Sequence, residues 1–284
     1  MKKIFAVVLA LTMVFALAGC GSKKTDEEAT TAGAETTTAA GEETTAAGEE
    51  TTTAGEETTT AGEESTTAGE EKAEVMSYEQ FMAAAVDDAV IVETYVQAKQ
   101  SWWEDKATVY TQTEDGAYFL YNMACSEEDY AKLEKGTKIR VTGYKAEFSG
   151  EIEIADATFE ILEGNYVAEA TDVTAKLGNE EELIKDMNKF VTFKGAKVLT
   201  ASDDTDATFL YKWDGSGKEG DDLYFRVEVD GKTYTFTVES YLCEKDTDVY
   251  KAVKELKAGD VVDMEGFLYW YEGVNPHITS VTVK

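Results

Sequence analysis

The sequence predicts a mainly β fold made of two related modules. Past residue 75 the chain becomes rich in aromatic and β-branched residues, in runs of about 4–8 residues separated by turns that contain Gly, Asp or Asn. A second observation is an internal repeat with a constant offset of 123 residues. It relates Leu133, Gly136, Gly143 and Gly150 to Leu256, Gly259, Gly266 and Gly273. The repeat predicts one module over residues 75–165 and a second over residues 166–284.

Residues 1–20 are expected to be a lipoprotein signal peptide. Lys2 and Lys3 form a basic start, and the apolar stretch over residues 4–17 is shorter than the ~20 residues needed to span a bilayer. The stretch ends in Leu-Ala-Gly-Cys at residues 17–20, which resembles a bacterial lipobox. That resemblance implies that Cys20 carries a diacylglyceryl group and becomes the mature N-terminus. An ordinary secretory signal with an incidental cysteine is the alternative.

Residues 21–74 are expected to be a disordered linker. TTAAGEE, TTTAGEE, TTTAGEE and STTAGEE follow one another over residues 44–71, and no aromatic residue or aliphatic residue larger than Ala occurs from 25 to 74. Such a segment cannot bury enough apolar surface to fold. Its seven-residue period lacks the large apolar positions of a coiled coil. We therefore expect a flexible tether that holds the modules away from the membrane.

The first module is predicted to begin with a short helix and to continue as strands. Ser77 and Gln80 form a capping-box pattern at the start of that helix. A second helix is predicted over residues 126–135. Strands are expected over residues 90–96, 107–113, 117–123, 137–141, 151–154 and 157–162. Between 117 and 123 both alternating sets of side chains are apolar, so alternation does not show which set faces inward.

The second module repeats this plan. Asn179 precedes a short leading helix, and a further helix is predicted over residues 247–257. Strands are expected over residues 190–200, 207–213, 223–229 and 233–242, and the aromatic run 267–271 is assigned to the fourth strand. In both modules a glycine-terminated helix therefore precedes a strand that contains a glycine.

This order of strands and helix resembles the OB-fold. Residues 135–143, KGTKIRVTG, are similar to the fourth strand of many OB domains. The resemblance implies two five-stranded Greek-key barrels, each with a leading helix and a short helix between strands 3 and 4. Other OB-folds bind oligonucleotides or oligosaccharides on one face. Residues 98–103, 115–119 and 135–150 are also similar to uncharacterised lipid-anchored surface proteins of Gram-positive anaerobes.

Charge and composition narrow the function. The chain has 57 Asp and Glu against 26 Lys and Arg, and residues 75–284 carry −21 of the net −31. This charge argues against a nucleic-acid partner, whose phosphates require basic side chains. One His and three Cys leave little material for a metal cage or a His-based triad. We therefore expect a non-enzymatic, monomeric protein without a cofactor.

Aromatic side chains are the main candidates for ligand binding. Trp102 and Trp103 fall in the first connecting loop of module 1, where OB-folds bind ligands. The full set of candidates is Trp102, Trp103, Tyr118, Tyr121, Trp213, Tyr269, Trp270 and Tyr271. The alternative is that these rings only fill two small barrels. Asp214, Asp221 and Asp222 are a weak Ca²⁺ candidate, because their spacing does not match an EF-hand.

The sequence thus predicts a lipid-anchored protein on the extracellular face of the cell membrane that binds a glycan or a surface protein. A nucleic-acid-binding OB protein and a purely structural surface lipoprotein are the alternatives. Cys125 and Cys243 are expected to be buried free thiols, because equivalent positions in separate barrels are too far apart for a disulfide.

Overall fold

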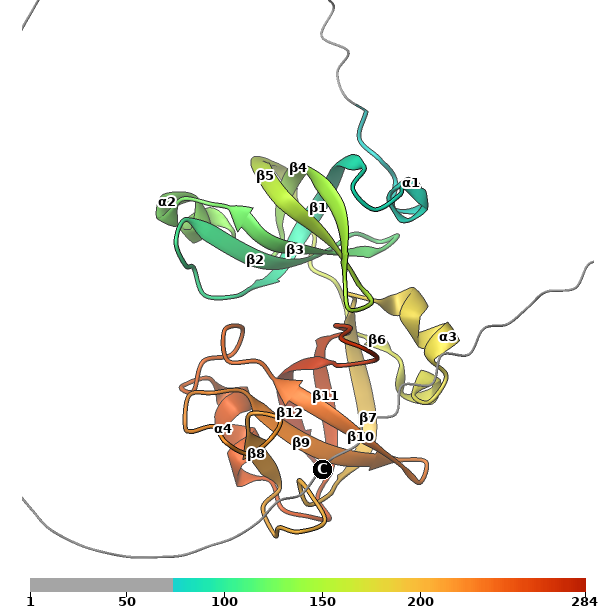
Figure 1. Ribbon diagram of the computed structural model, residues 1–284, viewed down its shortest axis with the longest axis vertical. Coiled ribbons are helices and arrows are strands. Elements are labelled where there is room, and N and C mark those ends of the chain that lie inside the picture. The colour runs from blue at the N-terminus through green and yellow to red at the C-terminus, as the bar shows by residue number, and fades with distance from the viewer. Residues whose placement is uncertain (1–73) are drawn as a thin grey trace, which may run out of the picture. The chain divides into compact units, whose positions relative to one another are not determined.

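The structure is a computed structural model, and it describes residues 74–284 (Figure 1). The expected signal peptide, the lipidation residue Cys20 and the linker up to residue 73 lie outside the described residues. Both modules belong to one compact unit of the chain.

The first module is a closed five-stranded barrel with strand order β1-β2-β3-β5-β4. Its helices are α1 (Tyr78–Ala83) and α2 (Glu127–Lys132), and the capping box of Ser77 and Gln80 is present on α1. Its strands are β1 (Ala89–Lys99), β2 (Lys106–Gln112), β3 (Ala117–Ala124), β4 (Thr137–Phe148) and β5 (Glu151–Asn165). β1 pairs with β4 to close the ring, and β3 pairs with β5 in parallel.

The second module repeats this topology with additions at its edges. Three short elements lead into it: β6 (Thr171–Asp172), α3 (Glu180–Leu183) and two 3₁₀ turns, Thr174–Lys176 and Ile184–Asp186. The remaining elements are β7 (Phe190–Val198), β8 (Phe209–Tyr211), β9 (Leu223–Val229), β10 (Lys232–Val238), α4 (Asp248–Glu255), β11 (Val261–Phe267) and β12 (His277–Val283). Pairing of β7 with β9 closes the ring β7-β9-β10-β12-β11, and β10 runs parallel to β12.

Each ring has the strand order of the OB-fold, a Greek-key barrel in which the fifth strand lies between strands 3 and 4. The helix between strands 3 and 4 is α2 in the first barrel and α4 in the second (Figure 1). The predicted fold class of two OB-like barrels is therefore confirmed.

The repeated glycines mark the same structural feature in both barrels. Gly143 in β4 and Gly266 in β11 lie where the fifth strand crosses and the register shifts. A Cβ on Gly143 would lie 2.8 Å from the carbonyl oxygen of Ala155, and one on Gly266 would lie 2.2 Å from that of His277. Both positions require glycine because the neighbouring backbone comes too close for any side chain.

Three expected elements differ from the structure. Residues 151–162 form one continuous strand, β5, in which Asp156 adopts a positive φ of 49° instead of breaking the strand. β8 lies at the edge of the second sheet and is not part of the barrel. The aromatic run 267–271 was assigned to a strand, but β11 ends at Phe267 and Tyr269 lies beyond it.

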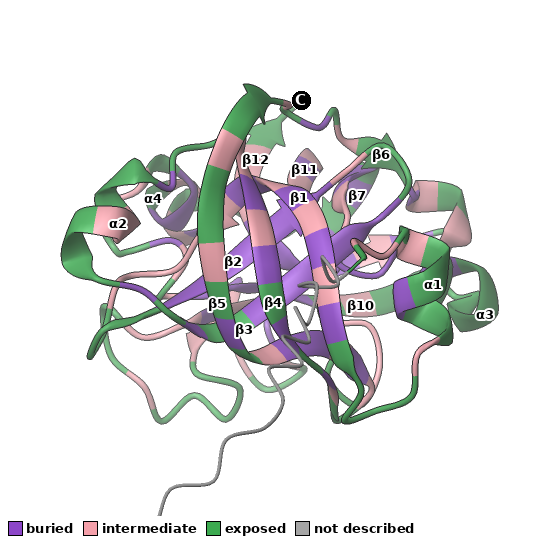
Figure 2. Ribbon diagram, turned by 90° about the horizontal axis from the view of Figure 1, so that it is seen from above, coloured by how far each residue is buried: buried purple, intermediate pink, exposed green. Residues whose placement is uncertain are grey.

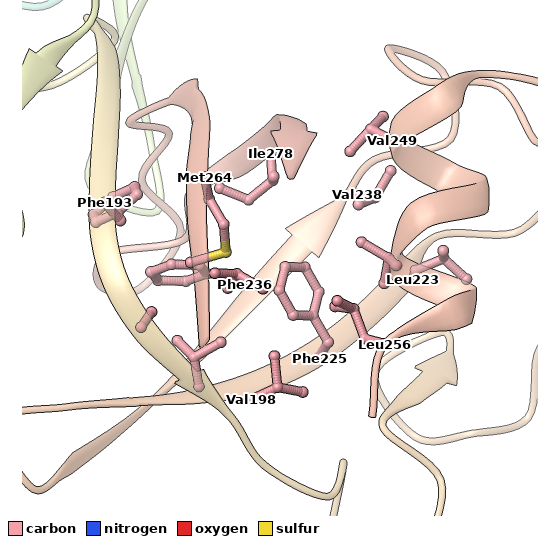
Figure 3. Close-up of a cluster of buried hydrophobic side chains, with 14 of the residues drawn as sticks. Phe193, Val198, Leu223, Phe225, Phe236, Val238, Val249, Leu256, Met264 and Ile278 are labelled. Atoms are coloured by element: carbon pink, nitrogen blue, oxygen red, sulfur yellow. The ribbon is translucent and has the colours of Figure 1, made fainter. Parts of the chain in front are cut away.

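Each barrel has its own apolar core. Burial alternates along β1 and β4 of the first barrel, as expected for strands with one face inward (Figure 2). In the second barrel Phe193, Phe225 and Phe236 meet in the interior beside Met264 (Figure 3). The ring centroids of Phe193 and Phe236 are 4.7 Å apart. These core contacts hold the strands of each barrel in place.

A third apolar cluster joins the two barrels. Tyr110 of β2 and Phe119 of β3 pack outside the first barrel, and Tyr110 stacks on Phe267 of the second with ring centroids 4.4 Å apart. Beside this cluster the carboxylate of Glu151 accepts hydrogen bonds from the Asn188 side chain at 2.5 Å and from the backbone N–H of Trp270 at 2.9 Å. The interface is therefore apolar at its centre and hydrogen-bonded beside it.

Candidate binding cleft between the barrels

A cavity of about 470 Å³ lies between the two barrels. This volume is in the range of small-molecule sites in proteins. Its aromatic lining is Trp103, Phe119, Tyr121, Tyr241, Tyr269 and His277. Its polar lining is Gln100, Ser101, Lys106, Thr108, Asn122 and Glu239. We call this cavity the inter-barrel cleft.

The first barrel contributes one wall of the cleft from the outer face of β2 and β3. Tyr118 and Leu120 point into the barrel core, so Phe119 and Tyr121 point outward on the same strand. Thr108 lies on the outer face of the neighbouring strand β2. This face, which OB-folds use for ligands, is thus partly covered by the second barrel and partly open to the cleft.

The two tryptophans of the first connecting loop have different roles. The indole N–H of Trp102 donates to the carbonyl oxygen of Cys125 at 2.8 Å, which ties the ring to the first barrel. Trp103 is 71% exposed and its backbone forms a bridge with Lys106 at the start of β2. Trp103 is therefore held by its backbone while its ring stays available at the edge of the cleft.

The second barrel contributes residues that lie just beyond strand ends. Tyr241, which is 67% exposed, follows β10, and its carbonyl oxygen accepts a 2.8 Å hydrogen bond from the backbone N–H of Ser101. Tyr269 follows β11, and its ring stacks on His277 with centroids 4.5 Å apart. Tyr269 also contacts Phe119 edge-to-face at 5.3 Å, so rings from both barrels meet in the cleft.

Two ionisable side chains lie at the floor of the cleft. Glu239 is 8% exposed, and its carboxylate accepts hydrogen bonds from the backbone N–H groups of Tyr241 and Leu242 and from the side chain of Gln100. Burial raises the pKa of Glu239 to about 7. Nδ1 of His277 is 2.8 Å from the Tyr110 hydroxyl, and burial lowers the pKa of His277 to about 3. The histidine is therefore neutral at pH 7.

The structure brings together only some of the aromatic residues expected to bind a ligand. Trp103, Tyr121 and Tyr269 line the cleft. Tyr118 and Trp270 are corrections to the expectation, because they are 2% and 6% exposed. Tyr118 fills the core of the first barrel, and Trp270 packs against Gly150 at the interface. These two rings have no surface left for a ligand.

Two further candidate rings are exposed but lie away from the cleft. Tyr271 contacts Phe148 with ring centroids 5.9 Å apart, and neither residue lines the cleft. Trp213 is 76% exposed in the turn after β8. Its exposure matches that of Trp103, which makes Trp213 a useful control residue.

The Ca²⁺ candidates are each engaged in their own loop contacts. Asp214 accepts from the backbone N–H of Ser216, Asp221 from that of Lys218, and Asp222 from Ser240. Within residues 74–284 no group of three or more His, Cys, Asp or Glu side chains is placed to hold a metal ion. The carboxylates of this loop therefore order its turns.

The cysteines of the described region are free and buried, as expected. Burial raises the pKa of Cys125 to about 11 and that of Cys243 to about 12, so both remain thiols at neutral pH. No helix in residues 74–284 is both long enough and apolar enough to cross a membrane.

Sequence reasoning did not identify Tyr241, Glu239 or His277 as parts of a site. Glu239 and Tyr241 follow the third strand of the second barrel. An acidic residue close to an aromatic residue at the end of a strand could have indicated a binding site. His277 is packed, and it also lines the cleft because β12 begins at the interface.

The chain is similar to several solved structures at low sequence identity. No family model and no curated protein matches the chain. Among 43 matching solved chains, a p204 HINb domain is 12% identical, with a TM-score of 0.34, and the match covers 71% of this chain and 100% of that one. A murine DNA-binding protein bound to double-stranded DNA is also 12% identical, with a TM-score of 0.32, covering 68% and 94%. A replication protein A heterotrimer bound to single-stranded DNA is 10% identical, with a TM-score of 0.26, covering 74% and 69%. The strand order of the two barrels defines the OB-like fold of the chain.

Proposed function

We propose that this chain is a lipid-anchored cell-surface protein that binds a glycan in the inter-barrel cleft. The observation that carries the proposal is the meeting of Trp103, Tyr121 and Tyr269 around one cavity between two OB-folds. The lipobox-like sequence at residues 17–20 and the repeat linker support a position outside the cell, and a surface protein of Gram-positive anaerobes is the setting that the sequence resemblance suggests. The proposal assigns binding and no reaction.

The lining of the cleft suits a sugar. Trp and Tyr rings offer an apolar face with a polar edge, which matches the apolar C–H face and the hydroxyl edge of a pyranose. Gln100, Ser101 and Asn122 add side chains that can donate and accept hydrogen bonds. A small number of polar groups among several rings is the usual composition of a small-molecule site.

Single-stranded nucleic acid is the second candidate. The cleft uses the β2–β3 face that OB-folds use for oligonucleotides, and aromatic rings stack on bases as well as on sugars. Phosphates need cations, however, and Lys106 is the only Lys or Arg among the described residues that line the cleft. The adjoining cavity is lined by Glu104, Asp105, Glu153 and Asp156. The charge of the site therefore favours the glycan.

A glycan array followed by calorimetric titration of the full-length chain tests the proposal. We expect quenching of tryptophan fluorescence by one class of cell-wall or dietary polysaccharide, and a loss of at least about tenfold in affinity for Trp103→Ala, the scale of a stacking contact. Trp213→Ala is the matched control and should bind as the wild type does.

A gel shift with single-stranded DNA at low salt tests the second candidate. Nucleic-acid binding that weakens steeply with salt and is lost in Trp103→Ala would replace the glycan with the second candidate. Absence of any glycan or nucleic-acid binding would contradict both candidates and leave the structural role considered in the sequence analysis.

A further inference from the structure

The floor of the inter-barrel cleft holds a carboxylate without a cation. Glu239 is 8% exposed and takes its three hydrogen bonds from the neutral donors described above. Within residues 74–284 no ion pair is formed by this side chain, although other acids of the two barrels have partners, such as Glu93 with Lys138 and Arg140. A buried carboxylate is costly unless it is paired or protonated. With its pKa raised to about 7 by burial, Glu239 is partly protonated near neutral pH, and a bound cation would favour its ionised form.

The surroundings of Glu239 favour a positive charge. Lys106 is exposed at the rim and is the only basic residue of the described lining. The adjoining cavity shares Lys106, Tyr121 and Asn122 with the cleft and adds four acidic residues. The other ionisable group at the floor, His277, is neutral because burial lowers its pKa to about 3, so it does not repel a cation.

The aromatic rings of the cleft also favour a positively charged ligand. The faces of Trp and Tyr rings attract cations, and they do so more strongly where water is excluded. Tyr121 and Tyr241 are 46% and 67% exposed, and Tyr269 is partly buried beside them. A cleft that combines such rings with a buried carboxylate is complementary to an ammonium group carried on an apolar frame.

We propose that the ligand of the inter-barrel cleft carries a positively charged amine that pairs with Glu239, and that the glycan is one whose amino sugars are not acetylated. This inference rests on the proposed glycan binding and narrows it to a chemical class. The rings hold the C–H faces of the sugar, and Glu239 distinguishes the free amine from its acetylated form.

The experiment compares two oligosaccharides of equal length, one of glucosamine and one of N-acetylglucosamine, by calorimetric titration of the full-length chain. We expect the cationic oligosaccharide to bind about tenfold more tightly, the scale of one partly desolvated charge pair. Glu239→Gln should reduce this preference to about twofold or less. Glu79→Gln, which removes an exposed acid on α1, is the matched control and should keep the full preference.

A second variant keeps the test valid if Glu239→Gln does not fold. Lys106 is exposed and forms no ion pair in the described region, so Lys106→Gln should fold normally. It should shift the preference about two- to threefold further toward the cationic oligosaccharide, because it removes a like charge.

The outcomes separate the two proposals. Equal affinities for both sugars, with loss of both in Trp103→Ala, would overturn the amine and leave the glycan function standing. No binding of either sugar would overturn the amine, and binding of another polysaccharide on the array would still leave the glycan function standing. Exclusive binding of a lysine-rich peptide would overturn both proposals, because it would place a protein partner in the cleft.

Discussion

The β2–β3 hairpin of the first barrel and the β9–β10 hairpin of the second occupy the same place in the topology but have different outer faces. On β2 the outward side chains Tyr110 and Gln112 are buried against the second barrel. On β9 the outward side chains Tyr224, Arg226 and Glu228 alternate with buried ones and remain partly exposed. The comparison shows that a duplicated barrel becomes an interface where its outer face turns apolar.

This difference explains why alternation was ambiguous along residues 117–123. Tyr118 and Leu120 fill the barrel core, whereas Phe119 joins the cluster between the barrels. A strand with two apolar faces is typical of a strand buried on both sides. The ambiguity was therefore itself a sign of a second interface.

The largest expected loss of stability comes from removing an aromatic ring from the interface between the barrels. Tyr110 is fully buried, so Tyr110→Ala should lower the free energy of unfolding by about 3–5 kcal/mol through the cavity it leaves. Tyr224→Ala on the partly exposed face of β9 should cost about 1 kcal/mol. Urea denaturation of both variants measures the difference. Equal losses would mean that the two hairpins are not distinguished by their outer faces.

The repeated glycines provide a comparison within the barrels. Gly266→Ala places a Cβ against backbone at 2.2 Å and Gly143→Ala at 2.8 Å, so both should destabilise by about 2–4 kcal/mol, Gly266→Ala more. Gly231→Ala, which meets nothing within 4 Å, should cost about 1 kcal/mol from its positive φ of 74°. Thermal unfolding checks the order, and a smaller loss for Gly266→Ala than for Gly231→Ala would contradict it.

The interface should also make stability depend on pH. Burial raises the pKa of Glu151 from 4.5 to about 8, so its contribution is fully present below pH 4.5 and is lost as the pH rises through 8. Glu239, with its pKa raised to about 7, acts in the same direction. The lowered pKa of His277 has the opposite effect on stability, because the folded state resists protonation of the buried ring as the pH falls below 6.5. This effect offsets the contribution of only one of the two carboxyl groups.

Urea denaturation at a series of pH values should therefore show stability falling by a few kcal/mol between about pH 5 and pH 8. Glu151→Gln, which keeps an uncharged group at the interface, should flatten this decline. A decline that is identical in Glu151→Gln would show that the interface carboxyl is not its source.

The smallest expected effect concerns a single hydrogen bond at the interface. Tyr110→Phe keeps the ring on Phe267 but removes the hydroxyl that lies 2.8 Å from Nδ1 of His277. We expect a loss of about 1–2 kcal/mol, because a buried ring nitrogen is left without a partner. Chemical denaturation of both Tyr110→Phe and Tyr110→Ala separates the contribution of the hydrogen bond from that of ring packing. A loss as large as that of Tyr110→Ala would assign the whole effect to the hydrogen bond.

The two OB-like barrels, the buried thiols and the position of Trp103 in a loop could be predicted from the sequence. These follow from local patterns: side-chain alternation, glycine spacing and turn residues repeated 123 residues apart. The net charge of −21 over residues 75–284 also predicts a poor match for phosphate.

The location of the candidate site, in contrast, depends on the tertiary structure. It buried Tyr118 and Trp270, left Trp213 away from the cleft, and placed Glu239, Tyr241 and His277 opposite Trp103. Local patterns cannot predict this, because the cleft joins residues about 140–175 positions apart whose proximity depends on how one barrel packs on another. The outer faces of the barrels, and not their repeated cores, set that packing.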